Sequence, residues 1–315
     1  AQFRNFGSTY FSYKLIELIY YVEELKAMTM NENLENKVCL ITGATNGIGE
    51  ESAKELNKMG AEIIFIARNP EKGNHLKEQL LKESGREATM IVADLSSQAE
   101  VKKAAETFLS MEKPLDILLN NAGIMNRERN ETVDGLEEVF SVNHLAYFTF
   151  TLLLAEKLKN TSGSRVVNVA SGAHQFVKDM NFEDLQSEKT FRPMQVYGQS
   201  KLANILFTKS LSEKLSSFGV TVNCLHPGFV STGIGSNNNQ GLWTFLMFLA
   251  KPFARKTDKG AETSIYLCCS SDVKDITGEY FVDCKVEKVS EAAKDPKQAT
   301  KLWEISEEIT GLRLN

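Results

Sequence analysis

The sequence predicts an α/β fold: a single domain built on a doubly wound parallel sheet with helices on both faces. Short apolar runs alternate with stretches of helical periodicity along the chain, with no internal repeat and no long linker. Alternating strands and helices are typical of parallel sheets with right-handed crossovers. Glycines and polar residues recur directly after the apolar runs, at the sheet edge where open α/β folds bind ligands.

Composition narrows the range of possible functions. The 315 residues are 42% hydrophobic, which can supply the core of one large α/β domain. The net charge of -5, the pI near 5.6 and the lack of a dense basic run argue against a nucleic-acid partner. The 5 cysteines fit no zinc motif and the 4 histidines have no metal-ligand spacing. We therefore expect free thiols in a reducing compartment and no metal.

An N-terminal extension, residues 1–36, precedes the predicted domain at residues 37–315. Residues 10–25 have an amphipathic pattern interrupted by charged side chains, which suits an interfacial or docking helix or an ordinary surface helix. No uninterrupted run of about 18 apolar residues is present in the sequence, so no segment is a clear membrane span. We expect an intracellular protein, either cytoplasmic or peripherally associated with an internal membrane.

The first strand and helix frame a glycine-rich turn. Residues 37–41 form an apolar run that predicts a buried strand, and residues 50–59 have helical periodicity. Between them the spacing G-x-x-x-G-x-G places glycines at Gly43, Gly47 and Gly49. Glycines let the backbone approach a pyrophosphate, and a helix N-terminus offers free amides and a favourable dipole. A plain strand-to-helix turn does not need so many glycines, so we favour a Rossmann-like dinucleotide site.

The second predicted strand, residues 61–67, is followed by Arg68. A site for NAD would usually have an acidic residue here to hold the ribose 2′-hydroxyl, whereas an arginine would pair with a 2′-phosphate. Arg68 could equally be a solvated residue at a strand end, but the missing acid favours NADP(H). After a helix at 70–84 and a strand at 88–93, Asp94 either accepts from the adenine amino group or caps the next helix.

Later elements continue the pattern. We expect a helix at 97–110, a strand at 115–119, a long helix at 136–158, strands at 165–170 and 221–225, and a final helix at 295–310. The small residues 120–123 would let the backbone lie close to a flat cofactor, unless they form an ordinary strand-end turn. Asn143 lies among apolar neighbours in the long helix. A buried Asn needs hydrogen-bond partners, so its role is structural, catalytic or both.

Tyr197 and Lys201 begin a predicted helix at residues 196–215. Because they are four residues apart, both side chains leave the same helix face. A cation beside a phenol favours the phenolate, so this pair could move a proton to or from an alcohol oxygen. Taken alone, the pair could also be a surface tyrosine beside a solvated lysine.

With these residues placed, residues 37–282 resemble the short-chain dehydrogenase/reductase family. The matching positions are Thr42, Gly43, Gly47, Ile48, Gly49, Asp94, Asn120, Asn121, Ala122, Gly123, Asn143, Ser171, Tyr197, Lys201, Pro227 and Gly228. Their order and spacing, rather than any one of them, carry the resemblance.

The resemblance implies a role for each site residue. Tyr197 would be the general acid/base, Ser171 would bind the substrate oxygen, and Asn143 would help hold a proton-relay water. Lys201 would bind the nicotinamide ribose and lower the pKa of Tyr197. The implied cofactor-binding residues are Gly43, Thr45, Asn46, Gly47, Ile48, Gly49, Arg68, Asp94, Leu95, Asn121, Ala122, Gly123, Tyr197, Lys201, Pro227, Gly228, Val230 and Thr232.

The resemblance narrows to the retinol dehydrogenase branch. Ser171 and Tyr197 are 26 residues apart, roughly twice the spacing common in the family, and the segment between them looks like that branch. The branch mostly uses NADP(H) and acts on retinoids, lipid aldehydes and other hydrophobic carbonyls. A small hydrophobic substrate, peripheral membrane contact and a homo-oligomer are the implied partners. Branch members that are anchored in membranes carry a longer apolar N-terminus than residues 10–25 provide.

Residues 233–255 combine a polar, glycine-flanked stretch with a strongly apolar one. They follow Pro227 and Gly228, where the family places its substrate lid, and large apolar side chains there suit a mouth for a hydrophobic substrate. A core helix is the alternative interpretation.

The sequence therefore predicts an NADP(H)-dependent oxidoreductase acting on a hydrophobic alcohol or carbonyl compound. A non-catalytic NADP-binding scaffold or redox sensor is the alternative, disfavoured because Ser171, Tyr197 and Lys201 are all present. A sugar-nucleotide epimerase would usually carry a larger C-terminal substrate domain.

Overall fold

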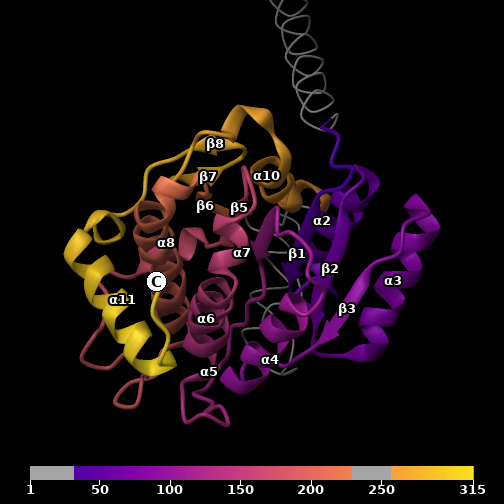
Figure 1. The fold of residues 1–315 in the computed structure, drawn as a ribbon. Helices are drawn as coiled ribbons and strands as arrows, with labels where there is room; N and C mark the ends of the chain where they lie inside the picture. The colour runs from indigo at the N-terminus through magenta and orange to yellow at the C-terminus, as the bar shows by residue number, and fades with distance from the viewer. Residues whose placement is uncertain (1–31, 229–256, 315) are drawn as a thin grey trace, which may run out of the picture.

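A single sheet organises the computed structural model, which describes residues 32–228 and 257–314. Its strand order is β3-β2-β1-β4-β5-β6-β7-β8 (Figure 1). The strands are β1 (Val38–Thr42), β2 (Glu62–Ala67), β3 (Thr89–Val92), β4 (Ile117–Asn120), β5 (Arg165–Val169), β6 (Thr221–His226), β7 (Tyr280–Val282) and β8 (Lys285–Val286). The first seven pair in parallel, and only β8 runs antiparallel. The predicted doubly wound α/β fold is confirmed, and the order changes direction between β1 and β4.

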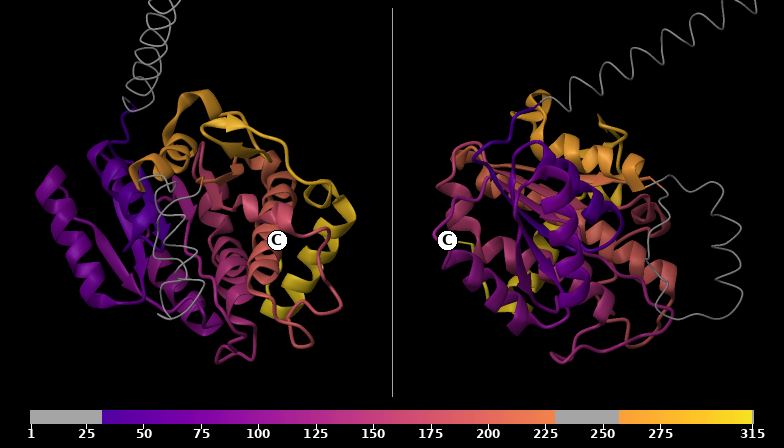
Figure 2. Two further views of the ribbon diagram at one scale, coloured as in Figure 1. Left: turned by 180° about the vertical axis from the view of Figure 1, so that it is seen from behind. Right: turned by 90° about the vertical axis from the view of Figure 1, so that its right-hand side faces the viewer.

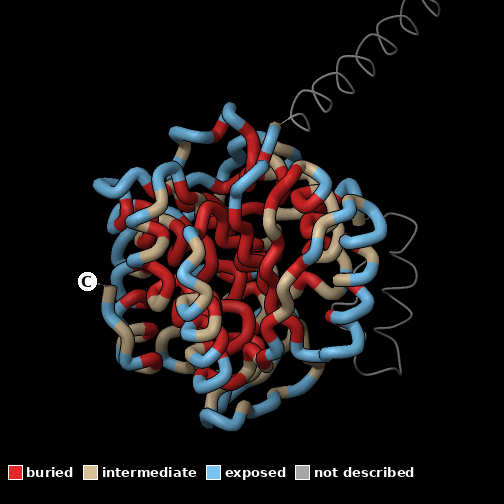
Figure 3. Tube along the Cα trace, turned by 45° about the vertical axis from the view of Figure 1, so that its right-hand side comes forward, coloured by how far each residue is buried: buried red, intermediate tan, exposed pale blue. Residues whose placement is uncertain are grey.

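Alternate residues of the strands supply two hydrophobic cores, one on each face of the sheet. Leu40 and Ile64 belong to the core covered by α4 (Gln98–Leu109), α6 (Ala146–Leu153), α7 (Ala155–Lys159), α8 (Pro193–Leu215) and α11 (Pro296–Thr310). Cys39 and Ile63 belong to the opposite core, covered by α2 (Gly47–Lys58), α3 (Pro70–Ser84) and α10 (Thr257–Cys269). Figure 2 shows the helices on both sides of the sheet, and Figure 3 shows the buried stretches gathered at the centre. Burial of both faces explains why the central strands are almost wholly apolar.

Helix ends follow the capping residues in the sequence. The Asn69 side chain accepts from Lys72 N at the start of α3, and Asp295 accepts from Lys297 N at the start of α11. Both helices end at a glycine in the left-handed region, as expected. At α4 the N-cap is Ser97, so the interpretation of Asp94 as the cap is wrong.

The expected continuous helix at 136–158 is wrong. A short helix, α5 (Glu138–Phe140), passes into a π-helical turn at Ser141–Leu145, and a break at Leu154 separates α6 from α7. A π-helical turn inserts an extra residue and shifts the side chains that follow it, and such turns are frequent at functional sites. The turn is fully buried and contains Asn143.

Several expectations lie outside the described residues: the amphipathic segment 10–25, the lid at 233–255, and the cofactor positions Val230 and Thr232. Within residues 32–228 and 257–314, no helix is long and apolar enough to cross a membrane. All five cysteines are free thiols, and four of them are buried.

Candidate active site

The C-terminal ends of four neighbouring strands bring the expected site residues to one edge of the sheet. Gly43 follows β1, Asn121 follows β4, Ser171 lies just beyond β5 and Pro227 follows β6. The pairing of β1 with β4, β4 with β5 and β5 with β6 makes these positions neighbours in space. The predicted grouping at the sheet edge is therefore present.

The glycine turn between β1 and α2 is packed too closely for side chains. Gly43 has a φ of +67°, and a Cβ there would lie 2.7 Å from the Ala122 Cα. A Cβ on Gly49 would overlap the Asn121 amide and the Gly43 carbonyl. The N-cap of α2, Asn46, makes no side-chain capping hydrogen bond. The first amides of α2 are thus available to an anion, as a dinucleotide pyrophosphate requires.

Asn121 and Thr42 bind the glycine turn to the loop that follows β4. Asn121 Nδ2 lies 3.0 Å from both the Thr42 and the Gly43 carbonyl oxygens and donates to them. Thr42 Oγ1 accepts from the amides of Asn121 at 2.9 Å and Ala122 at 3.1 Å. The Asn121 side chain therefore holds the turn in shape. Sequence reasoning assigned no role to Thr42, although a hydroxyl at the end of β1 was a visible signal.

Tyr197 and Lys201 lie in the first turns of α8, which begins at Pro193, three residues before the expected start. Lys201 is only 2% exposed. Its Nζ donates to the Val169 carbonyl at 2.9 Å and lies 5.6 Å from the centre of the Tyr197 ring. The interpretation of this lysine as a solvated surface residue is wrong, because a buried ammonium with one backbone acceptor is part of an interior site.

Desolvation shifts the pKa of both groups of the pair. Burial raises the pKa of the Tyr197 phenol to about 12, while a hydrogen bond with the Ser171 hydroxyl acts in the opposite direction. Burial lowers the pKa of the Lys201 ammonium to about 7. Burial is the largest cause of the shift of the Tyr197 pKa, and the expectation that Lys201 lowers that pKa stays a prediction. With its pKa raised, the Tyr197 phenol holds its proton at neutral pH.

Asn143 joins the π-helical turn to the loop after β4 and to α8. Its Oδ1 accepts from Ile124 N at 2.8 Å, and its Nδ2 donates to Ile124 O at 2.9 Å. The same Nδ2 lies 3.0 Å from Ser200 Oγ, which donates to the Tyr197 carbonyl at 2.8 Å. Asn143 thus ties together the segments that carry the expected cofactor and catalytic residues. Its role in holding a relay water stays a prediction.

Ser171 is supported by a histidine that sequence reasoning did not assign to the site. The Ser171 side chain accepts from Ala173 N at 3.2 Å. Buried His174 places Nδ1 2.8 Å from the Ser171 carbonyl and Nε2 3.3 Å from Ser290 N. Nδ1 is therefore the donor and Nε2 the acceptor of a neutral ring, in line with the lowering of the His174 pKa by burial. Its position three residues after Ser171 was the available signal.

The remaining expected cofactor residues lie further along the edge. Arg68 is exposed directly after β2. Asp94 accepts from Ser96 N at 2.9 Å, and its own amide donates to the Glu100 carboxylate at 2.7 Å. Leu95 is buried and Gly228 has a φ of +80°. These contacts do not show that Arg68 binds a 2′-phosphate or that Asp94 binds an adenine. Both roles therefore stay predictions.

Comparisons with known proteins agree with this geometry. Residues 37–243 match the family short chain dehydrogenase. The chain is 40% identical over 286 residues to retinol dehydrogenase 12 of Mus musculus, covering 90% of both chains. It is 39% identical over 292 residues to retinol dehydrogenase 14 of Mus musculus, covering 89% of this chain and 87% of that one.

A solved structure adds a likeness in three dimensions. The blue fluorescent protein from a metagenomic library, determined in complex with NADPH, matches with a TM-score of 0.62 and 25% identity. The match covers 79% of this chain and 97% of that one. One conclusion follows from the family match, from the curated relatives and from the arrangement of Asn143, Ser171, Tyr197 and Lys201. The chain belongs to the short-chain dehydrogenase/reductase family of oxidoreductases and is similar to its retinol dehydrogenases.

Proposed function

We propose that the chain is an NADP(H)-dependent oxidoreductase that transfers a hydride between nicotinamide and a hydrophobic alcohol or carbonyl compound. The observation that carries the proposal is the placement of the Tyr197 phenol beside the Ser171 hydroxyl and buried Lys201. Two hydroxyl groups converge at a sheet edge that also holds the glycine turn, an arrangement suited to one polarised oxygen of a substrate.

The residues at this edge fit a dinucleotide. The uncapped start of α2 would receive the pyrophosphate, because its first amides have no side-chain partner. An ammonium has three donors, and the Val169 carbonyl takes one of those of Lys201, which leaves donors for ribose hydroxyls. The bound nicotinamide would supply or accept the hydride.

The protein's own part is to hold and move one proton. In the direction of reduction, the Tyr197 hydroxyl donates its proton to the substrate oxygen while the Ser171 hydroxyl donates a hydrogen bond to the same oxygen. The raised pKa of Tyr197 keeps the proton in place until charge develops on that oxygen. The backbone contact of His174 restrains Ser171 for this role.

Preference for NADP(H) is supported by exposed Arg68 after β2. A charge-assisted hydrogen bond to a 2′-phosphate contributes about 1.5–3 kcal/mol, or one to two powers of ten in affinity. We expect the parent to bind NADPH more tightly than NADH by about that factor, and Arg68→Ala to remove the difference. Lys82→Ala, which removes an exposed positive charge near the far end of α3, is the control. Equal affinities of the parent for both cofactors would reject the preference.

The substrate class is tested by turnover. The relatives named retinol dehydrogenases support a hydrophobic substrate. Retinaldehyde, a steroid ketone and aliphatic aldehydes are assayed with each reduced cofactor by loss of absorbance. Turnover of at least one hydrophobic carbonyl supports the proposal. Cofactor binding without turnover of any of them would favour the non-catalytic scaffold instead.

A further inference from the structure

A cavity of about 450 Å³ lies beside the N-terminal end of α8. Its lining residues are Met125, Asn126, Arg127, Arg192, Pro193, Met194 and Gln195. They come from two segments, the loop after β4 and the start of α8, and most of the lining surface is apolar. The volume is in the range of sites that enclose small organic ligands.

Both walls of this cavity continue along the chain toward the catalytic cluster, that is, the expected catalytic residues Asn143, Ser171, Tyr197 and Lys201. Met125 directly follows Ile124, whose backbone exchanges two hydrogen bonds with the Asn143 side chain, at 2.8 and 2.9 Å. On the other wall, Met194 lies three residues before Tyr197 in α8, so the two side chains leave the same face of the helix. A substrate whose reacting oxygen meets Tyr197 therefore has this cavity as a neighbouring space for the rest of its length.

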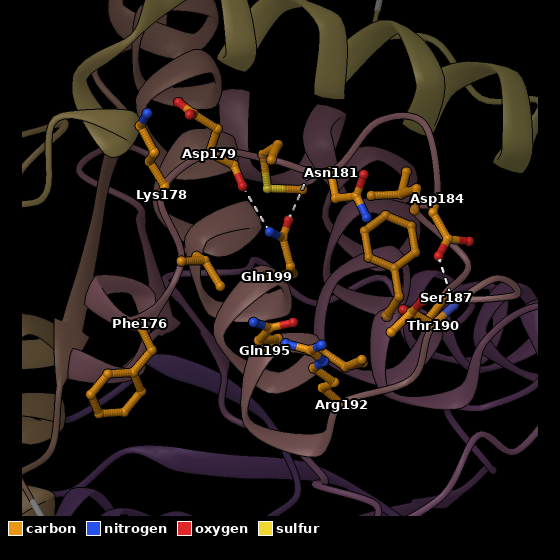
Figure 4. Close-up of a pocket in the computed structure, with 15 residues that line it drawn as sticks. Phe176, Lys178, Asp179, Asn181, Asp184, Ser187, Thr190, Arg192, Gln195 and Gln199 are labelled. Atoms are coloured by element: carbon orange, nitrogen blue, oxygen red, sulfur yellow. Dashed lines mark hydrogen bonds between the residues drawn. The ribbon is translucent and has the colours of Figure 1, made fainter.

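The charged side chains that line the cavity are all positive. Two arginines and no acidic residue contribute to the lining. The carboxylate of Glu138 lies behind Asn126 and accepts from that side chain at 2.7 Å and from Asn130 at 3.0 Å. Arg192 is exposed and makes no ion pair or side-chain hydrogen bond with the described residues. Arg192 and Gln195 also line a second, polar cavity of about 500 Å³, where Figure 4 shows them side by side and away from Asp179 and Lys178.

We propose that this cavity selects an amphiphilic substrate: an aldehyde or alcohol whose apolar chain ends in a carboxylate, which Arg192 binds. The apolar lining would contact the chain, and a guanidinium binds a carboxylate through two parallel hydrogen bonds. Arg192 is the N-cap residue of α8 and Tyr197 lies in its first turns, so the carboxylate and the reacting oxygen belong to opposite ends of the chain. This inference rests on the proposed function for the identity of the reacting end.

Binding tests the site without any turnover. Calorimetry with octanoate and with octanol is carried out on the full chain and on Arg192→Gln, Arg192→Lys and Lys178→Gln. We expect the parent to bind octanoate about ten-fold more tightly than octanol, as one charge-assisted contact supplies. Arg192→Gln should abolish that preference and Arg192→Lys should keep part of it, because lysine retains the charge but not the paired donors. Lys178→Gln removes the same charge from the polar cavity and should change neither affinity.

Turnover separates this inference from the proposed function. With reduced cofactor, octanal is compared with the aldehyde of the same length that ends in a carboxylate. We expect kcat/KM in the parent to favour the carboxylate form about ten-fold, and Arg192→Gln to lower that ratio to near one. Turnover of both aldehydes at equal kcat/KM, or equal binding of octanoate and octanol, would overturn the anionic site and leave the proposed function standing. Tighter octanoate binding that depends on Arg192, with no turnover of either aldehyde or of the retinaldehyde and steroid ketone tested above, would support the site and reject the proposed function.

Discussion

The glycine turn and the catalytic cluster lie at the same sheet edge but are held in opposite ways. At the turn, Gly43 and Gly49 allow close packing because they have no side chain. In the catalytic cluster, Asn143 and Lys201 are buried and held by hydrogen bonds from their polar atoms. Cofactor binding at the glycine turn should therefore be lost when an atom is added. The catalytic cluster should lose function when a polar atom is removed or changes charge.

Removal of the Tyr197 hydroxyl should have the largest effect. We expect Tyr197→Phe to lower kcat about 10²–10⁴-fold, the usual contribution of a general acid, because the ring remains and only the proton donor is lost. Affinity for NADPH, measured by fluorescence titration, should change little. Tyr266→Phe removes a hydroxyl from α10, on the opposite face of the sheet, and serves as the control. A folded Tyr197→Phe protein with near-parental turnover would exclude Tyr197 as the acid.

Addition of a methyl group at the turn should have the next largest effect. A Cβ on Gly49 meets the Asn121 amide and the Gly43 carbonyl, so Gly49→Ala should displace the turn and weaken cofactor binding about 10–100-fold. Gly85→Ala is the matched comparison, because Gly85 has a φ of +73° but nothing within 4 Å of the added atom. That variant should lose about 1 kcal/mol of stability from backbone strain alone and keep its cofactor affinity. The close-packing argument fails if both variants lose affinity equally.

The smallest expected effect is a pH dependence of stability from Lys201. Its folded-state pKa is lowered to about 7, whereas the unfolded chain holds the proton up to about 10.4. Between these values the unfolded state binds more protons, so the Lys201 contribution to the free energy of unfolding rises with pH. Below pH 7 its contribution is constant and unfavourable, because both states are then protonated.

Lys201→Met isolates this contribution. Urea unfolding of the parent and the variant from pH 6 to pH 10 gives the difference in their free energies of unfolding at each pH. We expect the free energy of unfolding of the parent to rise relative to that of the variant as pH rises above about 7, because a neutral Lys201 no longer opposes burial. A difference that does not vary with pH would mean that Lys201 is not desolvated as the structure places it.

Local patterns in the sequence were sufficient to predict the fold and to choose the expected site residues that the fold brings to one sheet edge. Hydrophobic periodicity and apolar runs predicted β1 to β6, and the helices expected at 70–84 and 295–310 correspond to α3 and α11. The glycine turn, Ser171 and the Tyr197–Lys201 pair follow from motifs that span few residues. Such features depend on backbone conformation and on neighbours in the chain, so they can be derived without knowing the tertiary structure.

Contacts between distant parts of the chain decided the rest. The Asn121 side chain binds the glycine turn across 78 residues of sequence, and Asn143 reaches Ser200 across 57. The pattern of apolar residues in 136–158 does not indicate the π-helical turn that contains Asn143. The raised pKa of Tyr197 and the lowered pKa of Lys201 come from burial beneath other elements. Desolvation depends on everything packed around a group. The sequence could therefore identify the expected catalytic pair, and only the tertiary structure could decide its protonation.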